Sequence, residues 1–247
     1  MNNLVNKSKT LVAAAAFCAM ASPALAADIL YGDFAGTTVN YGNVREDVQG
    51  LFGTPTISGD SLSFTPLEFT AESIDGGIDF TDGTLAFNVM PTTAGHAISG
   101  LTLEESGAFD LVGSGTDATR VAIAVVFSIN VLEVDNAPYV GASQVIHGST
   151  IFEANLIDSP GLGQAWQASA YLDIAALANA QHDITGKITK AAVVLDNKLL
   201  AISESGTLAF IDKKNVDAVI ITIPEPTTVA IIGLGSLCFV ARRRRSA

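Results

Sequence analysis

Acidic side chains are the first candidates for chemistry in the middle of this sequence. The stretch ESIDGGIDFTDGT holds Glu72, Asp75, Asp79 and Asp82 close together. Carboxylates turned toward one point would supply the oxygen ligands that Ca²⁺ prefers. Their spacing, however, matches neither an EF-hand loop nor the glycine-rich calcium nonapeptide. We therefore interpret the stretch as two turns rich in Asp and Gly around a short strand. We predict no metal site and no cofactor, and keep calcium as the alternative.

Histidine and serine chemistry has weaker support. His96, His147 and His182 fall in separate predicted segments, the first two in a loop and a turn, and no pair has a zinc-site spacing. Serine-nucleophile and phosphate-loop signatures are absent from the sequence. We predict no catalytic residue and no enzymatic activity. The alternative is a carbohydrate-binding or carbohydrate-active jelly-roll module, because carboxylate pairs for glycoside hydrolysis are defined in space and not in sequence.

The start of the chain has the three parts of a secretory signal. Lys7 and Lys9 precede an apolar run, and Ala24-Leu25-Ala26 forms a small-residue cleavage site in which Ala24 and Ala26 are the signal peptidase determinants. Residues 1–26 are thus predicted to be a signal peptide, removed on export. Signal peptidase is the first expected partner.

The end of the chain combines an apolar run with a cluster of positive charge. Residues 226–241 carry no charged side chain, and Arg242, Arg243, Arg244 and Arg245 follow them. A helix over this run would be short for a membrane span, but arginine side chains can extend to the headgroups. The arginines are predicted to stay on the cytoplasmic side as topology and retention signals, with the preceding domain across the inner membrane.

Pro224, Glu225 and Pro226 stand immediately before the apolar run. Two prolines around Glu225 favour an extended peptide, the form that proteases bind. The order Pro-Glu-Pro, apolar Gly-containing run and terminal arginines closely resembles the PEP-CTERM sorting signal. The resemblance implies that residues 224–247 are recognised by an exosortase, a membrane-embedded transpeptidase-like enzyme of Gram-negative bacteria that make exopolysaccharide. A permanently anchored single-pass membrane protein remains the alternative.

Residues 28–223 are predicted to form one exported domain of mostly β structure. Alternating apolar residues mark strands around Leu62, Leu85 and Leu103, and a long β-branched run over 119–135 predicts a strand buried on both faces. Turns are expected at DGG, TDGT, GSGTD and VDNAP. The alanine-rich stretch 165–180 predicts one short helix, with Trp166 packed in the core. Many short strands favour a β-sandwich of jelly-roll or Ig-like type, beside an N-terminal signal helix and a C-terminal transmembrane helix.

Charge and cysteine content restrict the role of this domain. Residues 28–223 hold 7 basic and 24 acidic side chains, and both cysteines, Cys18 and Cys238, lie outside it. The strong negative charge argues against nucleic acid as a partner, and disulfides are excluded. The sequence thus predicts an exported cell-surface or extracellular-matrix protein, associated with exopolysaccharide or biofilm. It would be held in the inner membrane only until an exosortase processes its C-terminus.

Overall fold

The computed structural model describes residues 28–47, 50–141 and 145–224, without the side chains of 219–224. The predicted signal peptide with Ala24 and Ala26 lies outside the described residues. So do Glu225, Pro226, the apolar run and Arg242–Arg245. Within the described part, no helix is long and apolar enough to cross a membrane.

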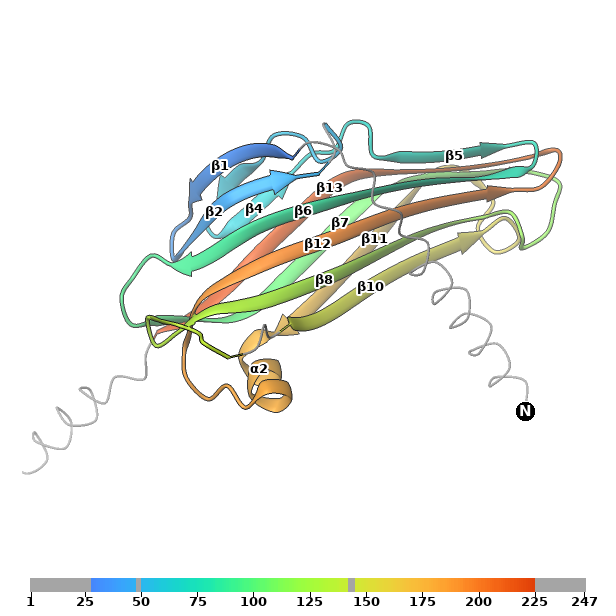
Figure 1. Ribbon diagram of the computed structural model, residues 1–247. Helices are drawn as coiled ribbons and strands as arrows, with labels where there is room; N and C mark the ends of the chain where they lie inside the picture. The colour runs from blue at the N-terminus through green and yellow to red at the C-terminus, as the bar shows by residue number, and fades with distance from the viewer. Residues whose placement is uncertain (1–27, 48–49, 142–144, 225–247) are drawn as a thin grey trace, which may run out of the picture.

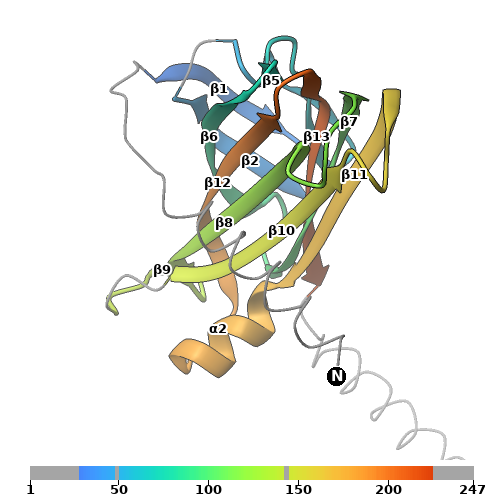
Figure 2. The ribbon, with the colours of Figure 1, turned by 90° about the vertical axis from the view of Figure 1, so that its right-hand side faces the viewer.

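Two antiparallel sheets packed face to face make up the described domain (Figures 1 and 2). Sheet A has seven strands in the order β1-β2-β6-β12-β8-β10, with β9 paired to β8. Sheet B has six strands in the order β11-β7-β13-β4-β3, with β5 paired to β13. The sheets curl into a jelly-roll-like sandwich, which confirms the predicted fold class.

The strands of sheet A are β1 (Ile29–Ala35), β2 (Val39–Glu46), β6 (Gly77–Pro91), β8 (Arg120–Val134), β9 (Ala137–Pro138), β10 (Val145–Asn155) and β12 (Ile188–Ser203). The strands of sheet B are β3 (Thr56–Ser58), β4 (Ser61–Phe64), β5 (Thr70–Ile74), β7 (His96–Gly113), β11 (Gly161–Asp173) and β13 (Thr207–Pro224). Five of them are 15 to 18 residues long. The expected short strands are therefore joined into longer ones.

The predicted turn TDGT lies in the interior of β6, so that prediction was wrong. Asp82 and Gly83 pair with Lys198 and Asn197 of β12 in an unbroken ladder. A Cβ on Gly83 would lie 2.9 Å from Leu51 Cδ1 and 3.3 Å from the ring of Phe52. Glycine is needed there because the segment after β2 packs against the strand, and not because the chain turns.

The predicted helix over 165–180 is wrong in its first half, since residues up to Asp173 belong to β11. Burial there alternates, with Trp166, Ala168 and Leu172 buried and the residues between them more exposed. This period of two is that of a strand, and it overrides the helix propensity of alanine. Helix α2 (Ile174–His182) follows, capped by the Asp173 carboxylate, which accepts a hydrogen bond from the backbone N–H of Ala176 at 2.8 Å.

Aromatic side chains fill one part of the core between the sheets. Phe69 is fully buried and meets Phe52 edge to face, with 5.2 Å between ring centroids. Phe52 in turn meets Phe64 at 6.1 Å. The run over 119–135 contains β8 (Arg120–Val134), an interior strand of sheet A in which residues 121–125 are all buried, as predicted.

Candidate functional site

The predicted sorting signal begins on the last strand of the sandwich. Pro224, the first residue of the Pro-Glu-Pro element, is the final residue of β13 and pairs with His96 at the start of β7. Pairing between these two strands runs along the length of β13, from Thr207 to Pro224. Figure 1 shows β13 ending at the side of the sandwich where α2 lies. The signal therefore starts where sheet B ends, with no linker between them.

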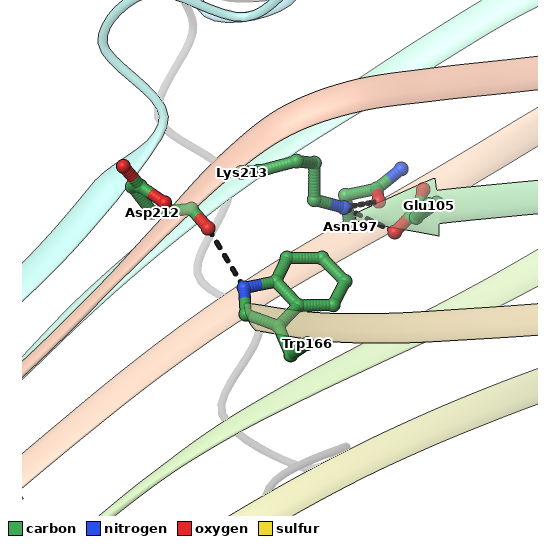
Figure 3. Close-up of polar contacts among 5 residues, drawn as sticks. All are labelled: Glu105, Trp166, Asn197, Asp212 and Lys213. Atoms are coloured by element: carbon green, nitrogen blue, oxygen red, sulfur yellow. Dashed lines mark hydrogen bonds and ion pairs between the residues drawn. The ribbon is translucent and has the colours of Figure 1, made fainter. Parts of the chain in front are cut away.

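A cluster of three polar side chains lies between the sheets, and we call it the core triad (Figure 3): Glu105 of β7, Asn197 of β12 and Lys213 of β13. The Lys213 ammonium donates hydrogen bonds to Glu105 Oε2 and to Asn197 Oδ1. Its Nζ lies 5.1 Å from the centroid of the Phe69 ring. Both side chains of the ion pair have no exposed surface. The triad joins both sheets, because β12 belongs to sheet A and the other two strands to sheet B.

Burial changes the acid–base character of the core triad. Desolvation lowers the pKa of Lys213, although the nearby Glu105 carboxylate acts in the opposite direction. Desolvation likewise raises the pKa of Glu105 against the influence of Lys213. Both changes favour the uncharged forms, an amine beside a carboxylic acid. A lysine amine becomes a nucleophile when it loses its extra proton, so these directions bear on the reactivity of Lys213.

The sequence predictions did not include the core triad, although the sequence carries a signal for it. Lys213 continues the inward series Ala209 and Ile211, and Asn197 stands between the inward residues Leu195 and Leu199. A polar residue at such a position of an otherwise apolar face must be buried. Glu104 and Lys214, the immediate neighbours of Glu105 and Lys213, point outward and are exposed. Residue type alone therefore does not tell which glutamate and which lysine is buried.

The four acidic residues considered for calcium do not converge. Asp79 Oδ2 accepts a hydrogen bond from the backbone N–H of Glu72 at 2.7 Å. Asp75 Oδ1 accepts one from the backbone N–H of Gly206 at 2.7 Å. Within residues 28–47, 50–141 and 145–224, no group of three or more His, Cys, Asp or Glu side chains is arranged to hold a metal ion. The structure thus gives the calcium alternative no support.

Asp82 belongs to a separate charged group on sheet A. Burial raises its pKa, the charge of Lys198 opposes that effect, and the carboxylates of Asp196 and Asp47 add to it. Lys198 Nζ lies 2.7 Å from Asp196 Oδ2 and is almost fully buried. The Asp47 carboxylate accepts a hydrogen bond from the backbone N–H of Thr84 at 2.6 Å. These residues form a charge network across neighbouring strands rather than an open carboxylate pair.

The histidines and the tryptophan also have defined places. His96 begins β7 and His147 lies within β10, so the predicted loop and turn were wrong, whereas His182 ends α2. His147 Nδ1 lies 3.1 Å from Ser128 Oγ. Trp166 is buried as predicted, but it lies in β11. Its indole N–H donates to the carbonyl oxygen of Asp212 over 2.8 Å (Figure 3).

Two hollows lie near Met90 on the part of the surface that the structure describes. The larger, of about 290 Å³, is lined by Asp33, Phe34 and Tyr41 among others. The smaller, of about 170 Å³, is lined by Glu133 and Lys190 among others. Each includes a single carboxylate side chain. Neither presents the two facing carboxylates that glycoside hydrolysis uses.

Several other carboxylates fasten loops to the sandwich. Glu204 accepts hydrogen bonds from the backbone N–H of Thr116 at 2.6 Å and from the Thr119 hydroxyl at 3.0 Å, which ties the β12–β13 turn to the β7–β8 loop. Asp60 accepts one from the backbone N–H of Thr38 at 2.7 Å, which ties the β3–β4 turn to the β1–β2 turn. We call these two contacts the carboxylate clamps.

The carboxylate clamps predict loss of stability in acid. Burial alone would raise the pKa of Asp60, but hydrogen bonds from Thr38, Val39 and Thr37 outweigh it and lower the pKa below the usual 3.8. The backbone N–H of Thr116 is the main cause that lowers the pKa of Glu204 below 4.5. A carboxylate whose pKa is lower in the folded state stabilises the fold at pH values above its usual pKa. That stability is lost as the pH falls through the folded-state pKa. The urea concentration at the unfolding midpoint should therefore be lower at about pH 3 than at about pH 5.

The Asp60→Asn variant provides the control for the acid prediction. It should lower the urea midpoint at pH 7 and show a smaller drop on acidification than the parent chain, because one of the titrating groups is gone. Glu68 is an exposed acid in the segment between β4 and β5, and Glu68→Gln should keep the parent's pH profile. Equal profiles for Asp60→Asn and the parent would contradict the role of the clamp.

Comparison with known proteins identifies the C-terminal segment. Residues 222–245 match the family model described as the PEP-CTERM protein-sorting motif. No curated protein sequence matches the chain. The match therefore covers the last three residues of β13, 222–224, and the tail that follows, and it does not extend over the rest of the sandwich.

Solved structures resemble the sandwich only distantly. Endoglucanase 3 of Trichoderma harzianum, from family GH12, is 11% identical over 81% of this chain and 100% of its own, with a TM-score of 0.22. The family 12 xyloglucanase of Bacillus licheniformis is 10% identical over 81% and 99%, with a TM-score of 0.24. The family 11 xylanase of Neocallimastix patriciarum is 9% identical over 78% and 99%, with a TM-score of 0.21. TM-scores this low carry no inference about the present chain.

The tail match confirms the resemblance drawn from Pro-Glu-Pro, the apolar run and the arginines. It includes Pro224, Glu225 and Pro226 and all four arginines. The motif is the mark of proteins that are exported and sorted by an exosortase. This chain carries a PEP-CTERM protein-sorting motif at residues 222–245, and the motif supports export and sorting by an exosortase.

Proposed function

We propose that this protein is a non-enzymatic structural component of the cell surface or extracellular matrix, associated with exopolysaccharide or biofilm. Its signal peptide directs export, signal peptidase cleaves after Ala26, and the apolar run holds the chain transiently in the inner membrane. An exosortase then recognises Pro224, Glu225 and Pro226 and removes the tail. The sorting motif at residues 222–245 is the observation that carries this proposal.

Placement of the motif supports the processing step. Because Pro224 still belongs to β13, the folded domain and the recognised peptide are contiguous. Loss of everything beyond the Pro-Glu-Pro element removes no residue from the described strands. The sandwich can thus be released with its hydrogen-bonded strands complete.

The use of acidic side chains supports a structural role for the domain. Glu46 is buried and accepts hydrogen bonds from the Tyr31 hydroxyl and from the backbone N–H groups of Gly50, at 3.0 Å, and Phe52, at 2.8 Å. Asp60 and Glu204 similarly hold turns in place. Carboxylates whose oxygens are occupied by such hydrogen bonds attach loops and turns to the sandwich, which is a structural use of acidic side chains.

The decisive experiment expresses the full chain in a Gram-negative host that has an exosortase. Mass spectrometry of the intact protein should find the parent chain shortened beyond the Pro-Glu-Pro element, at the surface or in the medium. Glu225→Ala should accumulate at full post-signal length in the inner membrane, because the side chain presented between the two prolines is lost. Deletion of Arg242–Arg245 should instead weaken membrane retention and orientation.

Glu68→Ala is the matched control, since it makes the same chemical change at an exposed site in the sandwich. It should be processed like the parent. If the parent retains the apolar run and arginines, the protein is a permanently anchored membrane protein and the proposal is wrong. Hydrolysis of a polysaccharide by the purified parent would overturn the non-enzymatic part alone.

A further inference from the structure

The core triad holds the reactants of an amide exchange. An amine attacks a carboxamide when it is uncharged, close to the carbonyl carbon and assisted by a group that moves protons. Lys213 supplies the amine, Asn197 the carboxamide and Glu105 the acid, and hydrogen bonds from Lys213 Nζ join it to both partners. Three strands hold the three groups, so their alignment is fixed by the fold.

We propose that Lys213 and Asn197 form an intramolecular isopeptide bond, with Glu105 as the catalytic proton carrier. The proposal assigns a covalent modification to the folded domain and does not depend on exosortase sorting.

The reaction is balanced without any co-reactant. Lys213 Nζ first transfers one proton to the Glu105 carboxylate, and its lone pair then attacks Asn197 Cγ to form the Nζ–Cγ bond. Glu105 passes a proton from the attacking nitrogen to Asn197 Nδ2, the Cγ–Nδ2 bond breaks, and NH₃ leaves. A secondary amide and protonated Glu105 remain. No atom changes oxidation state, and the only product lost is ammonia.

Two unsatisfied atoms agree with this reaction. Among the described residues, Asn197 Nδ2 and Glu105 Oε1 are buried without a hydrogen-bond partner. Buried polar atoms of this kind are rare and call for an explanation. Nδ2 is the leaving group, so nothing needs to be broken to release it beyond its own bond to Cγ. Oε1 is available to relay a proton, and in the product a protonated Glu105 can donate to the new amide.

The surroundings of the core triad disfavour charge and exclude water. A charged pair with no exposed surface is costly to desolvate, and such pairs add little stability compared with neutral groups. The amide and the carboxylic acid carry no charge. The aromatic ring of Phe69 lies beside Lys213 Nζ, and burial of all three side chains excludes the water that would hydrolyse an activated carboxamide.

The test is peptide mass spectrometry of the purified full chain after denaturation and digestion. The peptide containing Asn197 should be joined to the peptide containing Lys213, with a mass below their sum by about 17 Da, one ammonia. Lys214→Met removes the neighbouring lysine, which is exposed and ion-paired to Asp212 at 3.3 Å. This control should keep the joined peptide and the mass loss.

The variants Lys213→Met and Glu105→Gln should both appear at their full calculated masses, the first for lack of a nucleophile and the second for lack of a proton carrier. If either variant fails to fold, the parent's peptide map still decides the matter. Separate peptides at full mass in the parent would overturn the proposal and leave a buried ion pair. A mass loss that persists in Lys213→Met would also overturn it, since cyclisation of Asn197 alone releases ammonia.

Discussion

Phe69→Ala is expected to lower the free energy of unfolding by about 3–5 kcal/mol, the range for truncating a buried phenylalanine. The ring is fully buried, packs edge to face on Phe52 and lies beside Lys213 Nζ. Removing it opens a cavity between the sheets at the point where β5 meets β13. Urea unfolding at pH 7, followed by circular dichroism, measures the change.

Leu67→Ala is the matched control for Phe69→Ala. Leu67 lies two residues earlier in the chain and is 81% exposed. Its truncation should change the free energy of unfolding by no more than about 0.5 kcal/mol. A similar loss for both variants would show that the segment before β5 is not packed as described.

Gly107→Ala is expected to be nearly as damaging, although it adds a single methyl group. The new Cβ would collide with the carbonyl oxygen of Asp212 and lie 2.8 Å from the indole nitrogen of Trp166. That nitrogen donates to the same carbonyl. Overpacking costs about 1–3 kcal/mol, and a buried donor left without its acceptor costs about 1–3 kcal/mol more.

Fluorescence gives a local measurement for Gly107→Ala, because Trp166 is the only tryptophan of the chain. Emission should shift to longer wavelength if the indole loses its buried place. In Gly42→Ala, the nearest contact of the new Cβ would be Asp33 Oδ1 at 3.6 Å, an ordinary distance. This control should keep the parent's emission and stability, and an unchanged spectrum for Gly107→Ala would contradict the predicted clash.

The sequence predicted the strands well because their alternation is local. Leu85, Phe87 and Val89 alternate with the smaller or polar residues Thr84, Ala86 and Asn88, and they are buried in β6 as expected. The helix boundary was harder, because the period of two over Trp166, Ala168 and Leu172 is obscured by alanines on both faces. Gly83 was taken for a turn residue because its actual reason, contact with Leu51 and Phe52, comes from another part of the chain.

The sorting signal could be predicted from sequence and the core triad could not, because only the first is made of residues that lie close together in the chain. The tail could be identified from sequence because its recognition depends on consecutive residues, Pro224 to Pro226 and the terminal arginines. Glu105, Asn197 and Lys213 belong to three different strands. They meet because β7 pairs with β13 in sheet B and because β12 of sheet A packs against these two strands. A polar residue in an inward position of a strand predicts that its side chain is buried, but it does not predict which residue the side chain contacts.

Strand β13 has a mechanical consequence, since it carries both Lys213 and the start of the sorting signal. A tether attached beyond Pro224 pulls along the axis of β13, against its antiparallel ladder with β7 from Pro224 back to Thr207. Tension in that direction shears many hydrogen bonds at once instead of peeling them apart singly, which slows forced unfolding. An amide between Lys213 and Asn197 would add a covalent stop partway along the strand, so that extension could not pass residue 213 without breaking a chemical bond. The domain would then resist drag at the cell surface from the same end at which it is sorted.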